Sequence, residues 1–217
     1  MKQTLYLLIG LMVCTASAQE VDADLVSIQS RLDSIVSYSA DVELTVDISF
    51  INMPTKYARI MLEEGKEPSF ESSDFALLPK RGIDFSMREL FKDAFITVYR
   101  GEEELNGSSY KVVNVIPTTR QADFSIATLY LDVERKRIVQ AEINTKKEGS
   151  FLIEMGFENN RQALPDQVVV SFEVEQLSIP INFMGKDTTI DRKQLREEGP
   201  KTGKIYLKMS NYSIQTK

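Results

Sequence analysis

The chain has 217 residues, a formal net charge of −6, no histidine, no tryptophan and a single cysteine. A mildly acidic chain with no long basic run indicates that nucleic acid is not the partner. The lack of histidine, and of any cysteine beyond Cys14, excludes Ser-His-Asp and Cys-His nucleophile systems and the usual zinc ligand sets. Because glycine-rich phosphate loops and EF-hand loops are also missing, we expect no cofactor and no metal site.

Residues 1–18 have the pattern of a secretory signal peptide. Lys2 supplies the positive start, Leu5 to Val13 the apolar run, and Ala16-Ser17-Ala18 a small-residue cleavage site. The apolar run is far shorter than the roughly twenty residues that a spanning helix needs. We therefore expect a soluble periplasmic protein whose single domain covers residues 19–217 and whose net charge, without Lys2, is −7.

Cys14 allows one alternative, in which it is the lipidated residue of a bacterial lipoprotein. Val13 precedes it, where the lipoprotein pattern has a small residue. Ordinary cleavage after Ala18 is therefore favoured over a lipid anchor, and the mature chain would then contain no disulfide.

The first predicted element of the mature chain is an amphipathic helix over Asp22 to Ser37. Its apolar residues recur at helical spacing. From Ala40 to Asn52 the period changes to two, which predicts a long half-buried antiparallel strand. The apolar face of this strand carries Val42, Leu44, Val46, Ile48 and Phe50.

The middle of the chain contains a hairpin partner and a second helix. Met53-Pro54 ends the first strand, Tyr57 to Leu62 resumes as its partner, and Glu63 to Phe70 forms a charged turn. Ser86 to Asp93 is typical of a short helix with Ser86 as its N-cap. Further strands are predicted over Ala94 to Arg100, Ser109 to Ile116, Phe124 to Val133, Arg137 to Lys146, Ser150 to Phe157, Gln167 to Gln176 and Lys204 to Ile214.

These elements predict an α+β protein with about nine strands in an antiparallel meander. Several strands carry apolar residues on both faces, which suits a sheet that packs on helices and also lines a hydrophobic concavity. A β-sandwich or closed barrel explains the strand pattern equally well, and methionines and phenylalanines near strand ends favour the concavity slightly. The candidate cavity residues are Val42, Leu44, Val46, Ile48, Phe50, Phe75, Leu77, Leu78, Phe151, Ile153, Met155 and Phe157.

Several short motifs resemble the outer-membrane lipoprotein carrier (LolA-like) family. Ser30-Arg31-Leu32-Asp33, then Val36-Ser37-Tyr38-Ser39-Ala40 and a long alternating strand, resemble that family's opening. Lys66-Glu67-Pro68 falls where the family has a Lys-Arg-Pro turn, and Leu131-Asp132-Val133, Gly149 and Leu164-Pro165 are similar to its second half. The ending of the chain indicates a divergent branch.

This resemblance implies a strongly curved antiparallel half-barrel, with an N-terminal helix and a short lid helix over a hydrophobic concave face. It also implies a cavity for lipids or for the acyl chains of lipoproteins. In the family, an arginine of the Lys-Arg-Pro turn helps to hold the lid closed. Here Glu67 stands at that position between Lys66 and Pro68, so this latch is absent or rebuilt.

The resulting prediction is a periplasmic carrier of lipid or lipoprotein acyl chains, a monomer and not an enzyme, with a membrane-bound donor or acceptor as a further partner. A periplasmic sensor or regulator on the same half-barrel, with another protein as partner, is the alternative. A two-carboxylate hydrolase is the least favoured, because Glu102-Glu103-Glu104 beside Asn106-Gly107 is more simply a solvated hairpin tip.

Overall fold

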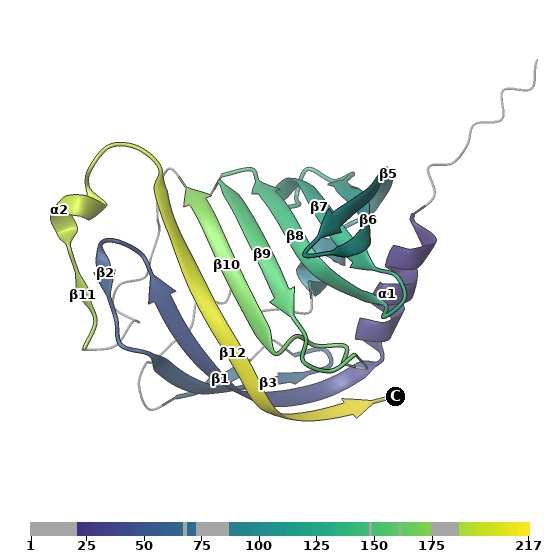
Figure 1. Ribbon diagram of the computed structural model, residues 1–217, viewed down its shortest axis with the longest axis horizontal. Helices are drawn as coiled ribbons and strands as arrows, with labels where there is room; N and C mark the ends of the chain where they lie inside the picture. The colour runs from purple at the N-terminus through teal and green to yellow at the C-terminus, as the bar shows by residue number, and fades with distance from the viewer. Residues whose placement is uncertain (1–20, 67–68, 73–86, 148, 161, 175–186) are drawn as a thin grey trace, which may run out of the picture.

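The computed structural model describes residues 21–66, 69–72, 87–147, 149–160, 162–174 and 187–217. Within these ranges, ten antiparallel strands form one curved sheet in the order β4-β3-β1-β12-β10-β9-β8-β7-β6-β5 (Figure 1). These strands are β1 (Ile35–Asp47), β3 (Lys56–Glu63), β4 (Ser69–Glu71), β5 (Phe95–Leu105), β6 (Ser108–Pro117), β7 (Phe124–Asp132), β8 (Arg137–Thr145), β9 (Ser150–Gly156), β10 (Gln167–Val174) and β12 (Lys201–Thr216).

Strand β12 corrects the predicted meander. Strands β5 to β10 follow one another as a meander, but the C-terminal strand β12 lies between β10 and β1. It joins the two halves of the sheet through long antiparallel ladders on both sides. No local pattern predicts this order, because the pairing of β1 with β12 joins opposite ends of the chain.

The N-terminal helix is shorter than its apolar periodicity predicts. Helix α1 (Ala23–Asp33) ends before Ile35, which is already the first residue of β1 and pairs with Thr216 of β12. Ile35 and Val36 are β-branched residues that suit a pleated sheet better than a helix. Asp22 caps the helix, since its Oδ1 accepts hydrogen bonds from the main-chain N–H groups of Asp24 and Leu25 at 3.0 and 3.2 Å.

The first predicted strand is also interrupted. Strand β1 ends at Asp47, and an isolated bridge between Ile48 and Ile51 turns the chain into β2 (Ile51–Asn52). Strand β2 then pairs with β11 (Thr189–Ile190), which precedes the short helix α2 (Arg192–Leu195). This group of elements lies at the end of the sheet opposite to α1 (Figure 1).

The predicted second helix is a single 3-10 turn, η1 (Arg88–Phe91). It begins after Met87, which has a φ of 58° in the left-handed region. The predicted N-cap, Ser86, lies outside the described residues, as do residues 1–18 of the predicted signal peptide. None of the helices in the described ranges has the length and apolar character needed to cross a membrane.

The sheet curves without closing into a barrel, because β4 and β5 remain its two edges. Register shifts interrupt the β1–β12 ladder between Ser39 and Asp41, and the β5–β6 ladder between Tyr99 and Gly101. Bulges of this kind bend a strand and increase its twist. The predicted α+β half-barrel is therefore confirmed, with α1 packed on the inner face of the curve.

Candidate functional site

The inner face of the sheet carries a continuous row of apolar side chains that cross-strand pairing places side by side. Each member is paired with a residue of the next strand, so all of them point to the same side of the sheet. The row runs from Val46 on β1 through Ile205, Val170, Ile153, Ala141 and Leu129 to Val113 on β6.

The two ends of this inner face are fully covered. At one end, Leu25, Ile28 and Leu32 of α1 are buried against the main core, which includes Leu129 and Val113. At the other end, the distal cluster consists of Ile48, Phe50, Ile51, Phe172 and Val174, with Ile190 and Leu195 packed against it.

Between these two cores lies a strip of apolar side chains that are only half-buried, which we call the central strip. An acyl chain that lay along this strip would remove further apolar surface from water, at about 0.8 kcal/mol for each methylene group buried. The central strip consists of Leu44, Val46, Ile205, Val170, Ile153, Phe151 and Ile143.

Helix α1 is fastened to the sheet at its N-terminal end by Lys111 of β6. The Lys111 ammonium group lies 2.7 Å from a carboxylate oxygen of Asp22 and 2.6 Å from one of Asp24. Burial lowers the pKa of Lys111, but these hydrogen bonds and charges outweigh it, so the pKa is raised above the ordinary value. The main-chain N–H of Asp22 also donates to the Thr97 hydroxyl at 2.8 Å.

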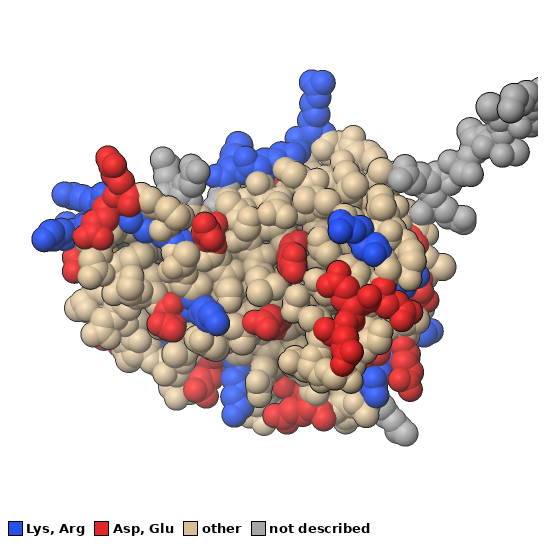
Figure 2. All heavy atoms as spheres, turned by 45° about the horizontal axis from the view of Figure 1, so that its top comes forward, with Lys and Arg blue, Asp and Glu red and all other residues tan. Residues whose placement is uncertain are grey.

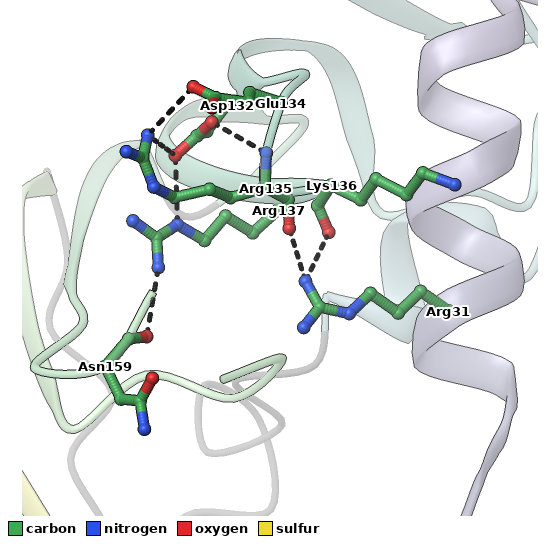
Figure 3. Close-up of polar contacts among 7 residues, drawn as sticks. All are labelled: Arg31, Asp132, Glu134, Arg135, Lys136, Arg137 and Asn159. Atoms are coloured by element: carbon green, nitrogen blue, oxygen red, sulfur yellow. Dashed lines mark hydrogen bonds and ion pairs between the residues drawn. The ribbon is translucent and has the colours of Figure 1, made fainter. Parts of the chain in front are cut away.

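The C-terminal end of α1 is held by Arg31, which reaches the turn between β7 and β8 (Figure 3). Its guanidinium group donates to the main-chain carbonyls of Arg135 and of Lys136, the latter at 3.3 Å. Burial, and then the charge of Arg137, lower the pKa of Arg31 from its ordinary value. Since side-chain contacts hold both of its ends, α1 is attached to the sheet along its whole length.

Asp132 organises the same turn. This carboxylate is only 6% exposed and accepts hydrogen bonds from the Arg135 main chain at 3.0 Å and from Arg137 Nε at 3.1 Å (Figure 3). The guanidinium carbon of Arg137 lies 4.3 Å from the centre of the Phe157 ring, within cation–π range. Arg137 also donates to the Asn159 carbonyl at 3.4 Å.

The space beneath α1 is almost filled. A cavity of about 10 Å³ remains there, which is the room that one water molecule needs. The space beneath the helix therefore does not accommodate a larger apolar ligand. This small cavity is lined by Ile28, Leu32, Met87, Arg137, Ile138, Met155, Phe157, Ala163 and Pro165.

The structure brings most of the predicted cavity residues to one face but to different parts of it. Leu44, Val46, Phe151 and Ile153 belong to the central strip, while Val42 and Met155 lie in the main core with the half-buried Phe157 packed against it. Ile48 and Phe50 lie in the distal cluster. Phe75, Leu77 and Leu78 lie outside the described residues.

The predicted lid turn is only partly described. Lys66 is exposed in the turn after β3 and forms an ion pair with Glu63, the last residue of β3. Glu67 and Pro68 lie outside the described residues. The ion pair with Glu63 therefore does not replace the arginine latch that the LolA-like resemblance implies.

Sequence reasoning missed Ile143, Val170, Ile205 and Lys56. Ile205, Leu207 and Met209 alternate with polar neighbours, so the period-two pattern of β12 already places them on one face. Lys56 has the same phase in β3 as the buried Ile60, and register pairs it with Leu44 of the central strip. The Lys56 residue is 2% exposed and forms an ion pair with Asp187.

The outer face is more polar. A shallow hollow of about 430 Å³ there is lined by residues that include Asp41, Glu43, Tyr57 and Glu71. Arg59 forms an ion pair with Asp41 at 2.6 Å. Acidic side chains also gather toward the side of the molecule where β5 and β6 lie (Figure 2). Neither feature continues the apolar row of the inner face.

The clustered glutamates lie on β5 and not in the hairpin tip itself, because β5 extends to Leu105. The hydroxyl group of Tyr130 lies 3.2 Å from Glu103 and 3.3 Å from Glu142, and so fills the space between these two carboxylates. No group of three or more Cys, Asp or Glu residues in the described ranges could hold a metal ion.

No family model matches the chain, and no curated protein matches it. Solved structures do. A domain assigned to outer-membrane lipoprotein sorting from Vibrio parahaemolyticus superposes with a TM-score of 0.52 at 14% identity, over 88% of this chain and 92% of that chain. A DUF1329 family protein from Desulfovibrio piger superposes with a TM-score of 0.55 at 10% identity, over 90% of this chain and 93% of that chain. A LolA superfamily protein from Nitrosomonas europaea superposes with a TM-score of 0.49 at 10% identity, over 89% of this chain and 94% of that chain.

At these identities the likeness concerns the fold. The first two superpositions show that the chain shares its fold with the lipoprotein-sorting domain and with the DUF1329 protein, in agreement with the fold that the sequence resemblance implies. With 14% identity or less, the chain is a divergent example of this fold.

Proposed function

We propose that this protein is a periplasmic carrier that binds lipid or lipoprotein acyl chains along the central strip and performs no covalent chemistry. In this proposal residues 1–18 are a cleaved signal peptide and residues 19–217 form one carrier domain that acts as a monomer. A membrane-bound donor or acceptor protein would load or unload it.

The observation that supports this proposal is the half-burial of the central strip between two closed cores. An inner face needed only for stability would be covered along its whole length, as it is beneath α1. Val170 and Ile153 are paired at the middle of the sheet, yet both stay half-buried. A row of this kind offers a long apolar surface that suits an extended acyl chain.

Native mass spectrometry of protein purified without detergent tests the proposal, followed by lipid extraction and by uptake of a fluorescent fatty acid. Val170→Glu places a charge on the inner face, and Val169→Glu places the same charge on the outer face of the same strand, where Val169 pairs with Tyr206. We expect acyl-chain binding to fall at least tenfold in Val170→Glu and to stay unchanged in Val169→Glu.

An empty protein that also takes up no added acyl chain would overturn the carrier proposal. If such a protein instead binds another periplasmic protein, the regulator alternative takes its place. The hydrolase alternative would require that Glu103→Gln or Glu142→Gln abolishes a measured turnover. We do not expect this result, because Tyr130 occupies the space between the two carboxylates.

A further inference from the structure

Lys56 is a buried cation at the border of the central strip. It is the first residue of β3, and its cross-strand partner on the inner face is Leu44. Its side chain is 3% exposed, although lysine is almost never fully buried unless it is paired. An ammonium group so far from water requires a negative partner, because the desolvation of an unpaired charge is strongly unfavourable.

The partner in this structure is Asp187, which precedes β11. The two groups form an ion pair, and the hydrogen bond from Lys56 is the largest of the effects that hold the pKa of Asp187 below its ordinary value. The side chain of Asp187 is 56% exposed, whereas that of Lys56 is 3% exposed. Asp187 could therefore leave the pair for water at little cost in solvation, while Lys56 could not.

We propose that Lys56 binds the anionic head group of the ligand, a carboxylate or a phosphate, in exchange for Asp187, while the acyl chain lies along the central strip. This inference rests on the proposed carrier function and assigns its ligand class, an amphiphile with an anionic head. No covalent bond is made or broken. A charge-assisted hydrogen bond from the ammonium group to the ligand replaces the one to Asp187.

The geometry of the sheet sets the length of such a ligand. From Lys56 on β3 the strip crosses β1, β12, β10 and β9 to Ile143 on β8. Five strand spacings of about 4.8 Å make about 24 Å, which accommodates one extended long acyl chain. The head group would then lie at the β3 end, and the acyl chain would point toward strands β9 and β8.

Three probes with the same alkyl chain test the inference: palmitate, hexadecyl phosphate and hexadecanol. Their dissociation constants are measured with the full-length mature protein, its Lys56→Met and Asp187→Asn variants, and Lys208→Met as a control. Lys208 is exposed on β12 and pairs with Glu43 on the outer face, so its replacement makes the same charge change away from the strip.

We expect the wild type to bind the better of the two anions about tenfold more tightly than hexadecanol, as one hydrogen bond to a charged group predicts. Lys56→Met should lose this preference but keep hexadecanol binding, which also shows that the variant is folded. Asp187→Asn should bind anions more tightly, and Lys208→Met should behave as the wild type. The anion that is preferred assigns the head group as a carboxylate or a phosphate.

Equal binding of all three probes to the wild type, or an anion preference that survives in Lys56→Met, would overturn the head-group inference and leave the carrier function intact. If the wild type binds none of the three probes, both the carrier function and this inference are overturned.

Discussion

Gly203 of β12 lies directly beneath Ile48, so that a methyl group added at Gly203 would lie 2.5 Å from Cγ1 of Ile48. The same methyl group would approach the Phe172 ring to 2.8 Å. Ile48 and Phe172 are 5% and 7% exposed in the distal cluster, so neither can move aside without opening that core. The missing side chain of Gly203 therefore allows Ile48 and Phe172 to pack against the sheet in the distal cluster.

We expect Gly203→Ala to lower the free energy of unfolding by about 1–3 kcal/mol, as overpacking of a core does. Chemical denaturation measures this change. Ile48→Ala alone should cost about 2–4 kcal/mol, because it removes buried methyl groups. The double variant should lose less unfolding free energy than the two single variants together, because Ile48→Ala makes room for the methyl group that Gly203→Ala adds. Strictly additive costs would show that the two residues are not in contact.

The buried carboxylate of Asp132 predicts a second change in stability. Asp132→Ala removes the ion-pair partner of Arg137, whose side chain is only 10% exposed. We expect a loss of about 3 kcal/mol in the free energy of unfolding. Glu134→Ala is the matched control, because the Glu134 side chain is 84% exposed and its contact with Arg135 is 3.6 Å long. A control that costs as much as Asp132→Ala would contradict this account of the turn.

Tyr130 predicts how stability depends on pH in alkaline solution. Burial, followed by the charges of Glu142 and Glu103, raises the pKa of Tyr130 to about 12, above the roughly 10 of an unfolded tyrosine. Because the pKa of Tyr130 is higher in the folded state, folding is favoured by keeping this phenol protonated. This contribution to the free energy of unfolding is complete below about pH 10 and is lost as the pH rises through about 12.

We therefore expect Tyr130→Phe to flatten the fall in unfolding free energy between about pH 10 and 12, and to remove one late-ionising phenol from the absorbance titration at alkaline pH. Tyr99→Phe is the control, because residue Tyr99 is 59% exposed. The account of the Tyr130 environment is wrong if the two variants titrate alike.

Arg31 predicts the strength of the attachment of α1. Arg31→Met keeps most of the apolar stem but removes the hydrogen bonds to the β7–β8 turn. We expect a cost of about 1–2 kcal/mol, together with faster amide hydrogen exchange confined to α1. Exchange that increases across the whole sheet would contradict a local attachment.

Much of the fold could be predicted from the sequence because the strands are amphipathic. Seven predicted strands after residue 93 correspond to β5–β10 and β12, with ends displaced by a few residues. The order of the strands could not be predicted, because β12 is paired at both edges through contacts that are distant along the chain. The break after Asp47 was hidden, since Ile48 and Phe50 continue the alternation of β1.

The site could be predicted only in part for a related reason. The alternation of β1 and β9 identified Val46 and Ile153, but a pattern does not show which apolar residues stay half-buried. Lys56 was missed because a lone lysine at the start of a strand is ordinarily solvated, and its burial depends on tertiary packing and on Asp187.

The central claim is that an acyl chain lies on the inner face, and photo-crosslinking tests it most directly. A fatty acid with a diazirine in mid-chain is bound to the protein and activated, and the labelled residues are mapped by mass spectrometry. The account predicts adducts on Ile153, Val170 and Ile205, with none on the outer-face neighbours Val169 and Tyr206. Adducts on the outer face, or in the hollow beside Tyr57, would contradict it.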